Sequence, residues 1–99
     1  MKITKTINGN RMDVAPEGKI NALTAPELEN EITGHLEGIT ELNFDFSLVE
    51  YISSAGLRTL LFLQQSMDDV NGTLTVRNVP QIVMDIFEVT DFNSIITIL

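Results

Sequence analysis

The chain has 99 residues, which fits a single domain with one hydrophobic core, residues 1–99. Its 43% apolar residues favour a folded globule, and its net charge of −8 argues against nucleic acid and anionic membranes as partners while favouring a basic partner surface. The absence of cysteine excludes disulfides, thiolate metal sites and cysteine nucleophiles.

The first part of the chain predicts a β-hairpin. Residues 3–7 alternate apolar or lysine side chains with threonine, as in a strand with two different faces. Asn8-Gly9-Asn10 has the residue types of a tight hairpin turn, and Met12 and Val14 continue into a second, antiparallel strand. Pro16-Glu17-Gly18 is expected to end that strand.

A helix is predicted to begin at Thr24-Ala25-Pro26-Glu27. Thr24 and Glu27 have the spacing of a capping box, and Pro26 lies in the first turn, where its missing N–H costs little. Gly38 is expected to end this helix. Its buried stripe would consist of Ala25, Leu28, Ile32 and Leu36.

The rest of the chain predicts alternating strands and helices. The order β-β-α-β-α-β-α-(β) indicates an α/β fold, with a mixed sheet, right-handed crossovers and helices packed against the sheet. We expect a strand at residues 42–46, a helix from about Ser54 to Met67, and a strand with Leu74 and Val76 after the turn Asn71-Gly72. A further helix is expected to begin at Pro80, and its apolar residues are Ile82, Val83, Ile86 and Phe87. Residues 95–99 are expected to form a short strand or an apolar tail.

Residues 45–58 form the most informative segment. It runs from the end of a strand, through a short polar turn, into the first turn of a helix. Ser53 and Ser54 lie where the helix begins, beside backbone N–H groups that favour negative charge. Ser53 is the natural N-cap, which would leave the Ser54 hydroxyl free in solvent and able to accept a phosphate.

The segments 45–47 and 52–58 resemble the signature of STAS domains, specifically of the anti-sigma factor antagonists. The resemblance implies the STAS-type mixed sheet with helices packed against it. It covers almost the whole chain, including the family's turn before the first helix at residues 18–26, the turn Asn71-Gly72, and the last helical region at residues 79–92.

This resemblance implies a regulatory switch, with no catalytic activity, cofactor or metal site. In the family, the unphosphorylated antagonist binds an anti-sigma factor that is also a serine kinase, and thereby releases a sigma factor. Phosphorylation of one serine, which aligns with Ser54, ends the interaction, and a PP2C-type phosphatase reverses it. Ser53 and Asn21 stand where the family usually has Asp. We expect the partner-binding residues to be Asn21, Leu23, Asp45, Tyr51, Ser53, Ser54, Gly56, Arg58 and, from helical phase, Phe62.

Several of these residues also have a purely structural interpretation. Ser54 could simply cap the helix, and Ser53 is the alternative site of modification. Asp45 could position the partner or the kinase's metal ion, or could cap the turn before Ser47. Arg58, one turn after Ser54, could pair with an added phosphate or serve only as a solvated surface residue.

Helical phase places Phe62 almost opposite the expected buried face of its helix. That face would be centred on Leu57, Leu60, Gln64 and Met67, with Leu61 and Leu63 at its edges. Phe62 therefore shares the exposed side that starts at the serines, where an aromatic residue could anchor a partner or could be an ordinary exposed residue.

The sequence also bears on location and on a second function. Residues 1–5 lack the apolar core of a signal peptide, and no apolar run has the length of a membrane span, so we expect a cytoplasmic protein. We also expect it to be monomeric when free. The alternative function is that of a STAS scaffold or transporter-accessory subunit in which the serine is never modified.

Overall fold

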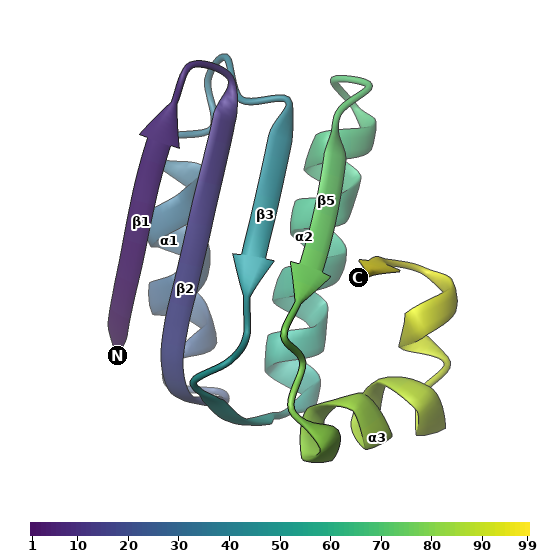
Figure 1. Cartoon of the computed structure of the whole chain (residues 1–99). Coiled ribbons are helices and arrows are strands. Elements are labelled where there is room, and N and C mark those ends of the chain that lie inside the picture. Colours follow the sequence, from purple (N-terminus) through teal and green to yellow (C-terminus); the bar gives the residue numbers. More distant parts are fainter.

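A central sheet of six strands carries the fold, and the computed structural model describes residues 1–99 (Figure 1). The order across the sheet is β1-β2-β3-β5-β6, and β4 pairs separately with β2. β1 is antiparallel to β2, and the other pairs are parallel, so the predicted mixed sheet is confirmed. The strands are β1 (Lys2–Asn8), β2 (Arg11–Ile20), β3 (Glu41–Asp45), β4 (Val49–Ile52), β5 (Thr73–Arg77) and β6 (Thr97–Ile98).

Two helices, α1 (Ala25–Thr33) and α2 (Ser54–Asp68), cover the same face of the sheet (Figure 1). The third, α3 (Gln81–Val89), lies at the end of the sheet where β3 and β5 finish, and a short 3-10 helix, η1 (Phe92–Ser94), follows it. Stacked and edge-on aromatic rings continue the core from β3 into α3 and η1. The ring centroids are 5.8 Å apart for Phe44–Phe46, 6.3 Å for Phe46–Phe87 and 5.8 Å for Phe87–Phe92.

The other face of the sheet carries no helix and is polar. Asn43 of β3 donates from Nδ2 to Asp13 Oδ1 at 3.1 Å and accepts at Oδ1 from Thr75 Oγ1 at 2.8 Å. Because side chains alternate along a strand, the same strands supply buried apolar residues to the helix side and this polar row to solvent.

β2 continues through Pro16-Glu17-Gly18, so the prediction that this segment ends the strand is wrong. Pro16 lies between the part of β2 that pairs with β3, which reaches Val14, and the part that pairs with β4, which starts at Gly18. A proline without an N–H is most easily tolerated at such a gap. Gly18 adopts φ +93°, and the register shift there allows β2 to take β4 as a second partner.

β4 lies where the sequence predicted only a polar turn. Its two end residues are buried and the two between them are exposed, so it lacks the alternation that identifies a half-buried strand. The Gly18 N–H donates to Leu48 O at 2.9 Å, and Ile20 pairs with Ile52. β4 is therefore defined by long-range pairing with β2 and not by its local pattern.

α1 begins at Ala25 as predicted but ends at Thr33, well before the predicted stop at Gly38. Gly34 is the C-cap residue, and its N–H donates to Asn30 O at 3.3 Å. Gly38 instead adopts φ +81° in the turn that leads to β3. The predicted buried residues Ala25, Leu28 and Ile32 are confirmed, and Leu36, beyond the helix, is partly buried.

α2 matches its predicted bounds, but its buried face is rotated from the predicted one. Thr59 and Leu63 are buried, whereas Leu61 is 46% exposed. The cause is the neighbouring helix: α2 packs against α1 as well as the sheet, and Thr59 Oγ1 reaches Glu29 Oε1 at 3.5 Å. Phe62 is 48% exposed, so its predicted exposure is confirmed.

Candidate functional site

The start of α2 is fixed by the end of β2. Ser53, the N-cap residue, has extended backbone angles (φ −95°, ψ 177°), and its N–H donates to Ile20 O at 2.8 Å. The Ser53 carbonyl accepts the first intrahelical bond from Leu57 N at 3.0 Å. The N–H groups of residues 54–56 have no intrahelical acceptor, so this end of the helix carries partial positive charge.

The two serines differ in exposure. Ser54, the first residue of α2, is exposed, whereas the Ser53 hydroxyl is buried and has no hydrogen-bond partner. The predicted N-cap position of Ser53 is confirmed, but its side chain makes no capping bond. A modifying enzyme could reach the Ser54 hydroxyl in this conformation, whereas the Ser53 side chain would first have to turn outward.

An Asx turn organises the segment between β2 and α1. Asn21 Oδ1 accepts from Leu23 N at 2.9 Å and from Thr24 N at 3.1 Å. Thr24 Oγ1 accepts from Asn21 N at 2.9 Å and donates to Lys19 O at 2.7 Å. The amide oxygen of Asn21 is therefore used within the domain, and the turn leaves Leu23 81% exposed.

The predicted capping box at the start of α1 is wrong. The Thr24 hydroxyl is engaged with the end of β2 and makes no capping bond to the helix. Glu27 binds the N-terminal ammonium of Met1 at 3.0 Å. Long-range partners thus replace the local bonds that the sequence spacing indicated.

Asp45 caps the turn between β3 and β4. Its Oδ1 accepts from Ser47 N at 3.0 Å and from Asn78 Nδ2 at 3.2 Å. The bond from the Ser47 N–H is the main cause that lowers the pKa of Asp45, partial burial opposes it, and Asn78 and Arg77 add to the lowering. The structure therefore shows Asp45 capping the turn before Ser47, and its role toward a partner stays a prediction.

Charge removal at Asp45 should produce a pH-dependent loss of stability. Because its pKa is lower in the folded state than the ordinary 3.8, ionised Asp45 stabilises the fold above that pH, and the stabilisation disappears as the pH falls through the folded pKa. Asp45→Asn should lower the unfolding free energy by less than about 1 kcal/mol near pH 7, since solvent screens the site. Urea unfolding should show a difference between variant and parent near pH 7 that shrinks as the pH is lowered below 3.8. A difference that persisted in acid would identify a cause other than charge.

The remaining predicted contact residues divide into exposed and buried ones. Tyr51 of β4 is 43% exposed, and Ser54, Arg58 and Phe62 form one exposed stripe along α2 because they are one turn apart. Gly56 is buried: a Cβ built on it would lie 2.5 Å from Ile52 Cγ1. The prediction that Gly56 belongs to the contact face is therefore corrected, since it supports the site from beneath.

Two exposed apolar residues near this surface were missed from the sequence. Leu48, in the turn before β4, is 58% exposed, and Ile82, in the first turn of α3, is 53% exposed. α3 packs against β4, which brings its first turn beside the strand that carries Tyr51. No local signal identifies them, because Leu48 lies in the turn before the unpredicted β4 and Ile82 was expected on the apolar face of α3.

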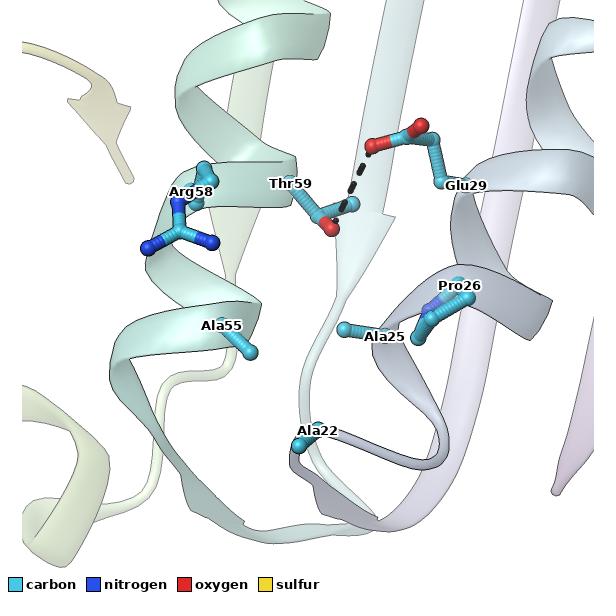
Figure 2. Close-up of a pocket in the computed structure, with 7 residues that line it drawn as sticks. All are labelled: Ala22, Ala25, Pro26, Glu29, Ala55, Arg58 and Thr59. Carbon is cyan, nitrogen blue, oxygen red and sulfur yellow. Dashed lines mark hydrogen bonds between the residues drawn. The ribbon is translucent and has the colours of Figure 1, made fainter.

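A cavity of about 300 Å³ lies between α1 and α2 (Figure 2). Glu29 of α1 and Arg58 and Thr59 of α2 are its polar residues, and the rest of the lining is Ala22, Ala25, Pro26 and Ala55. The Thr59 hydroxyl donates to Glu29 Oε1, while Arg58 makes neither an ion pair nor a hydrogen bond. In Figure 2, Ala55 and Thr59 point toward α1, whereas the unpaired Arg58 guanidinium points away from it.

The structure was also searched for a metal-binding cluster and for a membrane-spanning helix. No group of three or more His, Cys, Asp and Glu side chains is arranged to hold a metal ion. None of the helices combines the length and the apolar character that a membrane span requires.

Comparison with known proteins gives sequence relatives over almost the whole chain. A family model described as "Mlab, STAS domain" matches residues 3–98. BtrV of Bordetella bronchiseptica, whose name assigns it as an anti-sigma factor antagonist, is 30% identical over 96 residues. That alignment covers 96% of this chain and 83% of BtrV.

Solved structures share the fold at low sequence identity. An anti-sigma factor antagonist from Thermotoga maritima has a TM-score of 0.90 at 17% identity and covers 97% of this chain and 84% of its own. SpoIIAA, a Bacillus cell fate determinant in its phosphorylated form, has a TM-score of 0.77 at 11% identity, over 99% of this chain and 91% of its own.

Proposed function

Since the chain belongs to the STAS domain family of anti-sigma factor antagonists, we propose that it is a phosphorylation-controlled switch that binds an anti-sigma serine kinase and thereby releases a sigma factor. The kinase would phosphorylate Ser54 and end the interaction, and a PP2C-type phosphatase would restore it. The protein would act by binding in the cytoplasm and would supply no catalytic group of its own.

One observation carries this proposal: the two serines at the start of α2 differ in accessibility. Ser54 is an exposed residue, and the hydroxyl of the neighbouring Ser53 is buried. The hydrogen bond from Ser53 N to Ile20 O attaches the start of α2, which carries Ser54, to the end of β2. Such a site suits a reversible modification that changes surface charge and leaves the fold intact.

The contact surface would surround Ser54. It would combine the turn with Leu23, the exposed Tyr51 of β4, and the α2 stripe with Phe62. Exposed apolar and aromatic side chains are typical anchors of interfaces, and the net charge of −8 favours a partner with basic groups at its rim. A phosphate adds about 1.5 to 2 negative charges at the centre of this surface and raises the cost of removing water from it.

Phosphate mapping tests the proposal. Incubation with the anti-sigma serine kinase and ATP, followed by mass spectrometry, should locate the phosphate mainly on Ser54. Ser54→Ala should abolish the modification and still bind the kinase, because the unmodified hydroxyl contributes little binding energy. Phosphate found mainly on Ser53 would reassign the site. A protein that bound no kinase and took up no phosphate would favour the unmodified scaffold or transporter-accessory role.

Phe62 should anchor the partner without supporting the core. Phe62→Ala should change the unfolding free energy by less than about 0.5–1 kcal/mol, as expected for a surface position, and should weaken kinase binding by at least about 1–2 kcal/mol. Urea unfolding and titration calorimetry measure the two effects. Leu61→Ala is the matched control, because Leu61 is equally exposed on the same helix but lies off the stripe. If both variants bound the kinase as tightly as the parent protein does, the interface would lie elsewhere.

A further inference from the structure

Arg58 is one of three basic side chains of the protein that form no ion pair. Of the six lysines and arginines, Lys2, Lys5 and Arg11 are ion-paired, Arg77 lines a small depression together with Asp45, and Lys19 at the end of β2 is also without an ion pair. The guanidinium of Arg58 is exposed and makes no ion pair or hydrogen bond (Figure 2).

The position of Arg58 on α2 brings it near the Ser54 hydroxyl. Residues four apart lie on the same side of a helix, and helical side chains lean toward the N-terminus, so Arg58 leans toward Ser54. A guanidinium presents several N–H donors in one plane, which suits a phosphate with its three acceptor oxygens. The two side chains would therefore meet across one helical turn.

Figure 2 shows how Arg58 lies in the unmodified protein: its guanidinium points away from α1, whereas the next residue, Thr59, points toward it. The Glu29 carboxylate accepts a hydrogen bond from Thr59 and forms no ion pair with Arg58. No ion pair or hydrogen bond within the domain therefore competes with a phosphate for the guanidinium.

We propose that Arg58 binds the phosphate on Ser54. This inference rests on the proposed function, because it requires a phosphate at Ser54. Phosphorylation would then leave an ordered phosphate–guanidinium pair at the start of α2.

The experiment uses phosphoserine placed at position 54 during translation, so that no kinase is needed. Titration by ³¹P NMR gives the pKa of the phosphate, ordinarily about 6. Arg58→Gln should raise this pKa by at least about 0.3, and Arg58→Lys by less, because a nearby cation favours the dianion. The matched control is Arg11→Gln, which removes the same charge at the opposite end of the sheet and should change the pKa by less than about 0.1.

Equal pKa values in Arg58→Gln and Arg11→Gln would overturn the pairing. Failure of the kinase to modify Ser54 would contradict the proposed function and leave this result unaffected.

Discussion

Ser54→Asp is expected to weaken binding of the anti-sigma serine kinase by roughly 10- to 100-fold. A carboxylate carries less charge than a phosphate, but it has the same sign and occupies a similar place. A like charge or an unpaired charge in an interface costs on the order of 1–3 kcal/mol. Titration calorimetry measures the effect against Ser54→Ala, which keeps the site neutral and should bind as the parent does.

The effect should depend on where the charge is placed and should not come from unfolding. Thr73→Asp adds the same charge at an exposed position at the opposite end of the sheet, and should leave the affinity unchanged. The fold should tolerate Asp at position 54, since an acidic residue in the first turn of a helix stabilises it by about 0.3–1 kcal/mol. Unchanged affinity in Ser54→Asp would remove the electrostatic part of the mechanism.

Gly56→Ala is expected to destabilise the protein by about 1–3 kcal/mol. A Cβ at position 56 would lie 2.5 Å from Ile52 Cγ1 and 2.7 Å from Ile20 Cγ2, which is too close for carbon atoms. Both isoleucines are buried and branched at Cβ, so neither can rotate away without strain. The cost should exceed the gain in helix propensity from Gly to Ala, about 1 kcal/mol. Urea denaturation measures the net change.

Gly34→Ala is the matched control for this substitution. Gly34 also has a negative φ, −66°, at the end of α1, and its added Cβ would lie no closer than 3.4 Å to Asn30 O. Its unfolding free energy should stay within about 1 kcal/mol of the parent or rise, because alanine restricts the unfolded chain. Small, equal effects at both positions would show that α2 can shift away from the sheet without cost.

Elements with a clear local signal were predictable from the sequence. The hairpin turn at Asn8-Gly9-Asn10, the start of α1 at Ala25 and the strand after Asn71-Gly72 are all observed. Each depends on residue types that favour one local backbone geometry. β4 was missed because its residues show no alternation, and the continuation of β2 past Pro16 was missed because it depends on two different strand partners.

The position of the candidate site in the sequence was predictable, but the burial and hydrogen bonds of its residues were not. The exposure of Ser54 and Phe62 follows from helical phase, and both are exposed. The burial of the Ser53 hydroxyl and of Gly56 depends on how α2 packs against the end of β2, which no local pattern contains. The Thr24 cap failed for the same reason, since its hydroxyl bonds to Lys19 O instead.

The hydrogen bond from Ser53 N to Ile20 O has a consequence for how fast such a switch could respond. It fixes the first turn of α2 to the strand β2, so a group added to Ser54 would change the surface without any slow refolding of the backbone. Signalling delay would then come from the enzymes that add and remove the group, and the domain itself would follow them within the nanoseconds of side-chain motion.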